Sequence, residues 1–160
     1  MRIASRTKQF YFALIVVLVA TSFAQARNRL VCTEPNPASM CTPEVTCGSA
    51  TAPCTVDITR AGSSANVRPG IPNARNNQPF CIKQGTTVVW MTSNRGTGFM
   101  ISFGDESPFD PEGPIIGGAN RQITVKAATP GCFRYDAGAF FSGATFGMSG
   151  GSNPELIIIP

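Results

Sequence analysis

Residues 80–92, Phe-Cys-Ile-Lys-Gln-Gly-Thr-Thr-Val-Val-Trp-Met-Thr, carry the clearest indication of the fold of this chain. β-Branched and aromatic residues dominate both halves of the stretch, and they favour extended backbone because they pack well on a pleated surface. Gln84-Gly85 separates the two halves and is typical of a turn. The stretch therefore predicts two consecutive strands, residues 80–83 and 86–92.

Similar strand signals occur on both sides of this stretch. Residues 121–127 alternate between apolar and polar side chains, which places Ile123 and Val125 toward a core. Further strands are expected at residues 54–60, 99–103, 132–136 and 156–159. Polar or Gly- and Pro-rich loops are expected at residues 61–79, 104–120 and 137–153. Because no mature segment has a convincing helical period, we expect an all-β sandwich or barrel.

The N-terminus, residues 1–26, has the pattern of a cleaved signal peptide. The first eight residues carry three basic side chains, and an apolar run follows over residues 10–20. Ala24-Gln25-Ala26 supplies the small residues that a signal peptidase recognises. A retained membrane anchor is less favoured, because the apolar run is shorter than the roughly 20 residues that span a bilayer. We expect a secreted or periplasmic mature chain with no membrane span.

Charge and composition limit the possible functions. Of the 13 Lys and Arg residues, three belong to the expected signal peptide, so ten remain against nine acidic residues and the mature net charge is +1. No run of Lys or Arg provides a surface that could follow a phosphate backbone, so we expect no nucleic-acid partner. The chain has no histidine, which excludes Ser-His-Asp and Cys-His catalysis and imidazole metal sites.

Six cysteines in the expected mature chain indicate three disulfides, since the compartment is oxidising. They are Cys32, Cys41, Cys47, Cys54, Cys81 and Cys132, and their spacings do not match zinc sites. The sequence does not select one connectivity. The most economical pairing closes the first four among themselves and joins Cys81 to Cys132. Residues 27–53, rich in Cys and Pro, are expected to be an N-terminal segment held by cross-links.

Three short motifs follow one another in an order that a known family shares. Gln84-Gly85 precedes Val88-Val89-Trp90, a later strand reads Pro-Gly-Cys-Phe-Arg-Tyr over residues 130–135, and Gly147-Met148-Ser149-Gly150 precedes the last strand. In this order the motifs resemble those of the cupredoxins, the blue-copper proteins, over about half of the chain. The resemblance implies a Greek-key β-sandwich over residues 54–160.

The residues at the family's copper positions depart from its pattern. The resemblance puts Phe99 and Phe140 where the family has histidines and Ala137 where it has cysteine, and only the axial methionine has a counterpart, Met148. A blue-copper site needs two imidazoles and a thiolate, and methionine is only a weak axial ligand. The resemblance therefore implies the fold without a type 1 copper site, and we expect no cofactor.

Three other groups of side chains are candidates for function. An aromatic group either forms a contact patch for a protein, glycan or lipid or fills space near the lost copper site; it comprises Phe140, Phe141 and Phe146. An acidic loop either provides a calcium or carboxylate-pair site or is simply solvated; it contains Asp105, Glu106, Asp110 and Glu112. Three methionines either form a soft Cu(I) site or pack in the core; they are Met91, Met100 and Met148.

Together these observations predict an exported, non-enzymatic binding or structural module with an unknown protein or glycan partner. Two alternatives stay open. One is a periplasmic copper-handling protein that uses methionines, and the other is a hydrolase that uses carboxylates of the acidic loop.

Overall fold

The computed structural model describes residue 32 and residues 36–62, 64–104, 107–142, 144–147 and 154–160. Two short 3-10 helices, η1 (Pro37–Met40) and η2 (Pro43–Val45), precede the first strand. The strands are β1 (Cys54–Ala61), β2 (Ser64–Pro69), β3 (Phe80–Lys83), β4 (Thr87–Met91), β5 (Gly98–Ser102), β6 (Phe109–Asp110), β7 (Ile115–Gly118), β8 (Ile123–Ala127), β9 (Gly131–Arg134), β10 (Asp136–Phe141), β11 (Ala144–Phe146) and β12 (Glu155–Ile159). The expected all-β class is confirmed.

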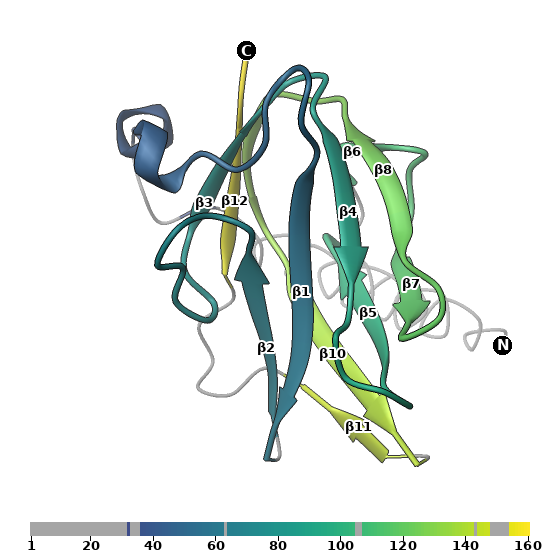
Figure 1. Ribbon diagram of the computed structural model, residues 1–160. Coiled ribbons are helices and arrows are strands. Elements are labelled where there is room, and N and C mark those ends of the chain that lie inside the picture. Colours follow the sequence, from purple (N-terminus) through teal and green to yellow (C-terminus); the bar gives the residue numbers. More distant parts are fainter. Residues whose placement is uncertain (1–31, 33–35, 63, 105–106, 143, 148–153) are drawn as a thin grey trace, which may run out of the picture.

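The strands form three hydrogen-bonded sheets with the orders β2-β1-β4-β8-β6, β11-β10-β5-β7 and β3-β12-β9. The pairs β1–β4 and β3–β12 are parallel, and the other pairs are antiparallel. In Figure 1 the sheet of β2, β1 and β4 lies in front of β10 and β5, so the molecule has two layers. This arrangement is sandwich-like.

The core lies between these layers because strands such as β1, β2, β4 and β5 alternate between buried and more exposed residues. In β1 and β4 the inward positions are apolar and fully buried, as at Val56 and Trp90. Phe99 and Ile101 are the corresponding buried residues of β5. The expected orientation of Val125 toward the core is confirmed, and Ile123 packs partly buried against it.

Five strands occur where loops were expected, namely β2, β6, β7, β10 and β11, so the prediction was wrong at these positions. In β10 the inward residues are small, and Ala139 lies directly opposite the buried Phe99 of β5. An Ala- and Gly-rich stretch has weak strand propensity by itself. Here the partner strand, and not the side chains of β10, provides the pairing.

Three disulfides are present, as expected, but the predicted Cys81–Cys132 bond is wrong. The pairs are Cys32–Cys132, Cys41–Cys81 and Cys47–Cys54. Cys81 on β3 and Cys132 on β9 both lie opposite Ile157 of β12, one on each side of that strand. Strands on either side of a third are about 9–10 Å apart, whereas bridged Cα atoms lie within about 7 Å.

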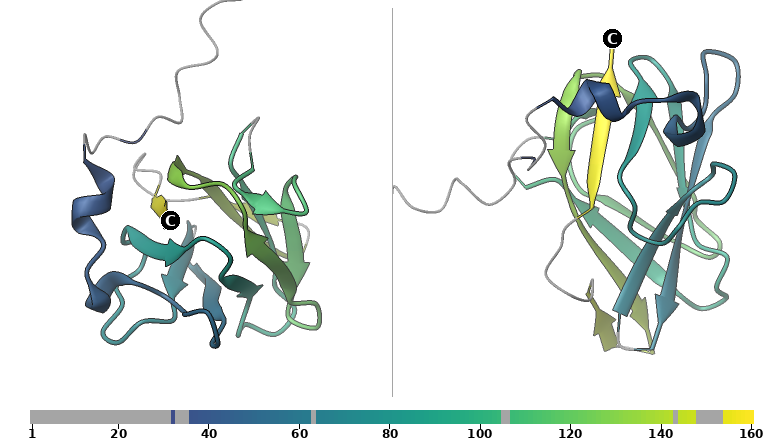
Figure 2. Two further views of the ribbon diagram at one scale, coloured as in Figure 1. Left: turned by 90° about the horizontal axis from the view of Figure 1, so that it is seen from above. Right: turned by 90° about the vertical axis from the view of Figure 1, so that its left-hand side faces the viewer.

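Each of these two cysteines therefore bonds a cysteine of the N-terminal segment. Cys41 reaches β3 and Cys32 reaches β9, so the segment spans the sheet β3-β12-β9. Figure 2 shows the two 3-10 helices running along the side of the molecule next to β3 and β12. The expectation that cross-links hold this segment is consistent with the observed pairing.

Tryptic digestion of the non-reduced protein is expected to give one species of three linked peptides. Cys32 and Cys41 share the peptide of residues 30–60 with Cys47 and Cys54, whereas Cys81 lies in residues 76–83 and Cys132 in residues 127–134. Mass spectrometry checks this directly. A linked pair of 76–83 and 127–134, separate from 30–60, would contradict the pairing in the structure, and a reduced digest serves as the control.

Candidate functional site

Three of the four residues that the cupredoxin resemblance matched to copper ligands are described, and they lie on both faces of one sheet. Phe99 and Ala137 both face the core from neighbouring strands, since Ala137 lies opposite Ile101 and Ala139 lies opposite Phe99. Phe140 lies opposite Gly98 and faces outward, because it follows the inward-facing Ala139. A Cβ at Gly98 would be 3.5 Å from the Cδ2 atom of Phe140. Met148 lies outside the described residues. The structure thus brings together Phe99 and Ala137 but not Phe140.

The neighbouring Phe141 lies at the end of β10 beneath an arginine. The guanidinium carbon of Arg60 is 5.3 Å from the centre of the Phe141 ring, and a Cβ at Gly96 would be 3.6 Å from the same ring. Arg60 Nε also donates a hydrogen bond of 3.0 Å to the carbonyl of Gly62, which orients the guanidinium. The ring stays 39% exposed. This combination holds a cationic and an aromatic group side by side at the surface.

A shallow hollow of about 440 Å³ lies around this pair. Its lining consists of Arg60, Gly62, Asn94, Arg95, Thr97 and Phe141. Arg95 is exposed, and among the described residues no acidic side chain forms an ion pair with it. Guanidinium groups are planar, always charged and suited to bidentate contacts with carboxylate or phosphate. The hollow therefore combines anion-binding groups with one aromatic surface.

We call the surface that four segments form here the arginine end: residues 60–62 and 64, 94–98, 117–121, and 140–142 and 144. A backbone hydrogen bond joins two of these segments, since Ala119 N donates to Thr97 O at 3.1 Å. Within the second segment, Thr97 N donates to Asn94 O at 3.2 Å. A third arginine, Arg121, accepts through its carbonyl from Gly118 N at 2.9 Å. In Figure 1 β1 ends and β10 meets β11 at the lower end, whereas the turn after β7 lies higher up on the right.

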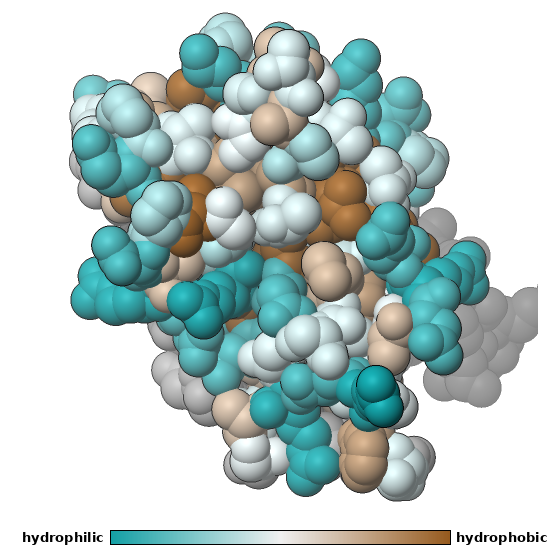
Figure 3. All heavy atoms as spheres, viewed as in Figure 1, coloured by the Kyte–Doolittle hydropathy of each residue, from teal (hydrophilic) through white to brown (hydrophobic). Residues whose placement is uncertain are grey.

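All charged side chains in the segments of the arginine end are positive. Its four segments contain Arg60, Arg95 and Arg121 and no Asp or Glu. A nearby carboxylate, that of Asp57, accepts hydrogen bonds of 2.9 Å from both the amide and the hydroxyl of Ser93. Figure 3 shows hydrophilic side chains over much of the lower half of the face formed by β1 and β2, whereas apolar ones gather higher up. A positive field at this end favours anionic ligands.

The aromatic residues at this end are conspicuous in the sequence, whereas the arginines are not. Arg60 at the end of β1, Arg95 in the turn before β5 and Arg121 after β7 are far apart in the chain, so no local motif marks them. The signal that could have found them is the absence of acids from these turns, but it has meaning only once the turns are known to meet. Phe141 lies in the hollow, whereas nothing is described for the side chain of Phe146.

The structure describes two of the four carboxylates of the acidic loop, and both are at the surface. Asp110 and Glu112 are exposed, and Asp105 and Glu106 lie outside the described residues. A second hollow lies beside this loop, and Glu112 is the one acid among the described residues that line it. Acid–base hydrolysis of glycosides needs two carboxylates about 5–9 Å apart. Asp110 does not line the hollow beside Glu112, so the described residues do not place such a pair inside it.

Two of the three candidate methionines face opposite sides of the molecule. Met91 follows the buried Trp90 on β4, and Met100 lies between the buried Phe99 and Ile101 on β5. Since side chains alternate along a strand, both methionines point away from the core, each from a different layer. They cannot share one copper ion. Met148, the third, lies outside the described residues.

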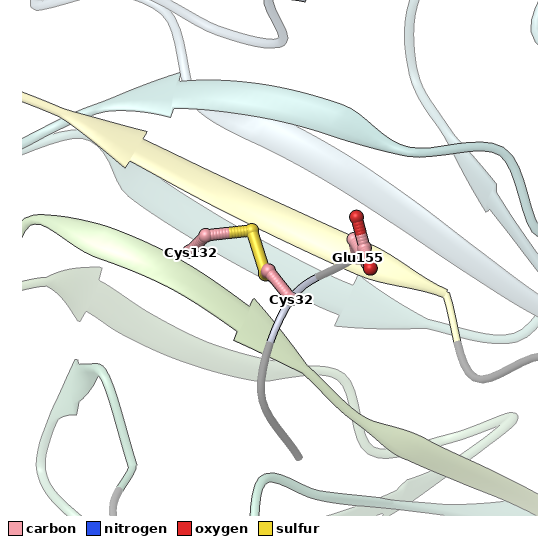
Figure 4. Close-up of side chains that lie close together, drawn as sticks. All are labelled: Cys32, Cys132 and Glu155. Carbon is pink, nitrogen blue, oxygen red and sulfur yellow. A yellow bond between two sulfur atoms is a disulfide. The ribbon is translucent and has the colours of Figure 1, made fainter. Parts of the chain in front are cut away.

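Cys32, Cys132 and Glu155 form a group whose potential ligand atoms lie within 4.8 Å of one another (Figure 4). Both sulfurs belong to one disulfide, so neither offers the thiolate that a metal would need. Glu155 is only 8% exposed, and its Oε1 lies 4.0 Å from Nε of Arg134. The group is therefore a disulfide next to a half-buried ion pair and not a metal centre.

Tyr135 is a buried titratable group next to Trp90 in the aromatic part of the core. Its ring centre is 6.0 Å from that of Trp90 and 5.3 Å from that of Phe103. Burial raises the pKa of the Tyr135 phenol far above its ordinary value, because the charged form would lose its hydration. The hydroxyl has no hydrogen-bond partner among the described residues.

Tyr135 is expected to stay protonated at alkaline pH until the domain unfolds. Tyr135 ionises near pH 10 in the unfolded chain but not in the folded one. Its contribution to the free energy of unfolding should therefore be constant below about pH 10 and fall by about 1.4 kcal/mol per pH unit above it. Tyrosinate absorbance and circular dichroism, followed together against pH, check this. Tyrosinate absorbance from Tyr135 in a natively folded protein near pH 10 would contradict it, and Tyr135→Phe identifies the signal.

No protein-family model and no curated protein matches this chain. The described residues contain no helix that is long and apolar enough to cross a membrane. Fold and surface thus define the class of the protein: a disulfide-bonded, sandwich-like all-β domain that presents arginines and an aromatic ring at one end.

Proposed function

We propose that this chain is an exported, non-catalytic binding domain whose ligand-binding surface is the arginine end. The signal-peptide pattern of residues 1–26 supports export, and three disulfides fit an oxidising compartment. The proposal includes a cupredoxin-like Greek-key topology without a type 1 copper site. The motif order supports that topology, and so do the two parallel strand pairs within mostly antiparallel sheets.

One observation carries the proposal: Arg60 lies over Phe141 beside Arg95, in a hollow at an end of the sandwich whose turns contain no acid. The mature chain has a net charge of only +1, so three basic residues at one end represent a separation of charge and not a generally basic protein. Such a separation steers an anionic ligand to one place on the surface. The absence of histidine supports a binding role without catalysis.

An anionic oligomer is expected to perturb the amide signals of the arginine end selectively. We expect ¹H–¹⁵N NMR shifts at residues 60–62, 94–98, 117–121 and 140–142 of the disulfide-bonded protein, and a loss of these shifts as salt is added, because salt screens exposed charges over about 10 Å at 0.1 M. A neutral oligomer of equal length is the control. Shifts spread evenly over the surface, or confined to the opposite end, would refute the proposal.

A further inference from the structure

We infer that the ligand of the arginine end is a carboxylated polysaccharide, in which a sugar ring contacts Phe141 and its carboxylate pairs with arginine. This inference rests on the proposed function and specifies its ligand class. The hollow, about 440 Å³ in volume, falls within the range of small-ligand sites, which is about 300–1,000 Å³. It is therefore large enough for one sugar unit of a longer chain.

The polar lining fits a sugar acid better than a bare anion. Arg60 and Arg95 provide two planar guanidinium groups, which bind carboxylates bidentately. Asn94, half-buried in the same lining, carries an amide that can both donate to and accept from hydroxyl groups. A simple inorganic anion would use the arginines but would leave the amide and the aromatic ring without a role.

The aromatic ring gives the hollow an apolar floor. Phe141 is 39% exposed, and its contacts with Arg60 and Gly96 hold it in place. The C–H faces of a sugar ring are apolar, and a fixed aromatic ring offers contact area at little cost in conformational entropy. Apolar contact with the ring and charge contact with the arginines can therefore occur in the same sugar unit.

The opposite face of the same sheet offers a second strip that a longer polymer could contact. Phe140, the next residue, faces outward and lies against Gly98, which pairs with Gly118 of β7. Two glycines side by side leave this strip flat, and Arg121 follows in the adjoining turn. A chain that carries one carboxylate per sugar could contact Arg60 or Arg95 with one unit and this second strip with another.

Other polyanions fit the surface less well. Nucleic-acid binding relies on many phosphate contacts, and the arginine end provides three arginines without a Lys/Arg run. Membrane binding needs apolar side chains that project into the lipid. Phe141 lies under a charged guanidinium, and Ile116, the most exposed large apolar residue among those described, lies apart from it on the outer face of the sheet near Met100.

The test is a calorimetric and NMR titration of the full disulfide-bonded protein with four probes. These are an oligogalacturonate, its methyl ester, a single-stranded oligonucleotide, and vesicles of phosphatidylcholine with phosphatidylserine. We expect the oligogalacturonate to bind at the arginine end and the methyl ester to bind at least about tenfold more weakly, since charge-assisted hydrogen bonds are lost.

Matched variants connect binding to the named side chains. The double variant Arg60→Gln/Arg95→Gln should lose at least about tenfold in affinity, whereas Arg68→Gln/Arg75→Gln, with the same change in charge on exposed residues elsewhere, should bind like the parent protein. Phe141→Leu should weaken oligogalacturonate binding while the binding of a small inorganic anion stays the same. Circular dichroism establishes that each variant is folded.

The outcomes separate this inference from the proposed function. Equal affinity for the acid and the methyl ester would overturn the inference, because the carboxylate would then not be recognised. Tighter binding of the oligonucleotide or the vesicles at the same residues would also overturn it but would leave the proposed anionic-ligand surface in place. If no probe binds at the arginine end, both the inference and the proposed function fail.

Discussion

Removing the Cys32–Cys132 disulfide is expected to lower the free energy of unfolding by about 4–5 kcal/mol, measured as Cys32→Ser/Cys132→Ser. This bond links residues 100 positions apart, and the loop-closure model assigns about 4.7 kcal/mol to a loop of 100 residues. Without the bond the unfolded chain gains conformational entropy, and the N-terminal segment loses its attachment to β9. Such a loss is a large part of the about 5–15 kcal/mol that stabilises a typical domain.

The Cys47–Cys54 disulfide provides the comparison within the same protein. It closes a loop of only seven residues, for which the same model gives about 2 kcal/mol. Urea unfolding followed by circular dichroism, at equal protein concentration, measures both double variants. If removal of the short loop destabilises the protein as much as removal of the long one, the stabilisation does not come from loop closure, and the buried sulfurs of Cys47 and Cys54 would explain it instead.

Replacing Trp90 with alanine is expected to destabilise the domain by about 3–5 kcal/mol, because the largest core side chain would leave a cavity. Trp90 is fully buried and lies edge-on to three other rings, Phe103, Phe109 and Tyr135, at centre distances of 6.5, 6.0 and 6.0 Å. Edge-to-face pairs of this kind contribute about 0.5–1.5 kcal/mol beyond area burial. The indole thus connects the two layers of the sandwich.

The next residue of β4 serves as the matched control. Met91 faces away from the core, so Met91→Ala should cost about 1 kcal/mol or less. Trp90→Phe keeps an aromatic ring and removes the indole N–H, which has no partner among the described residues, so its cost should lie between the two. Far-UV circular dichroism is the readout, since Trp90 is the only tryptophan of the chain. If the two alanine variants lost equal free energy of unfolding, this would contradict the placement of Trp90 in the core and of Met91 outside it.

Strand periodicity in the sequence predicted most of the sheet framework. Residues 80–83, 86–92 and 121–127 alternate or are rich in β-branched residues, and β3, β4 and β8 form there. Periodicity failed where a strand consists of small or polar residues, as in β10 and β2. In those strands the side chains carry little information, because the partner strand's backbone provides the hydrogen bonds and the partner's large rings provide the volume.

The candidate site could be predicted only in part. The sequence marks Phe140 and Phe141 as unusual because they are aromatic residues in a Gly- and Ser-rich stretch. It does not reveal that they face opposite sides of a sheet, since that follows from the register of β10 against β5. The partners of Phe141 are Arg60 at the end of β1 and Arg95 in the turn before β5, and both are more than 40 residues away from it in the sequence.

By itself, the sequence determined the all-β class, the presence of paired cysteines and the absence of histidine chemistry, because these follow from composition and from local periodicity. Only the tertiary structure decided which cysteines pair and which turns form the arginine end. Both depend on strand order and register: β12 lies between Cys81 and Cys132, and the ends of β1, β5, β7 and β10 meet at one end of the molecule. Strand order arises from packing between distant segments, which no local stretch of residues encodes.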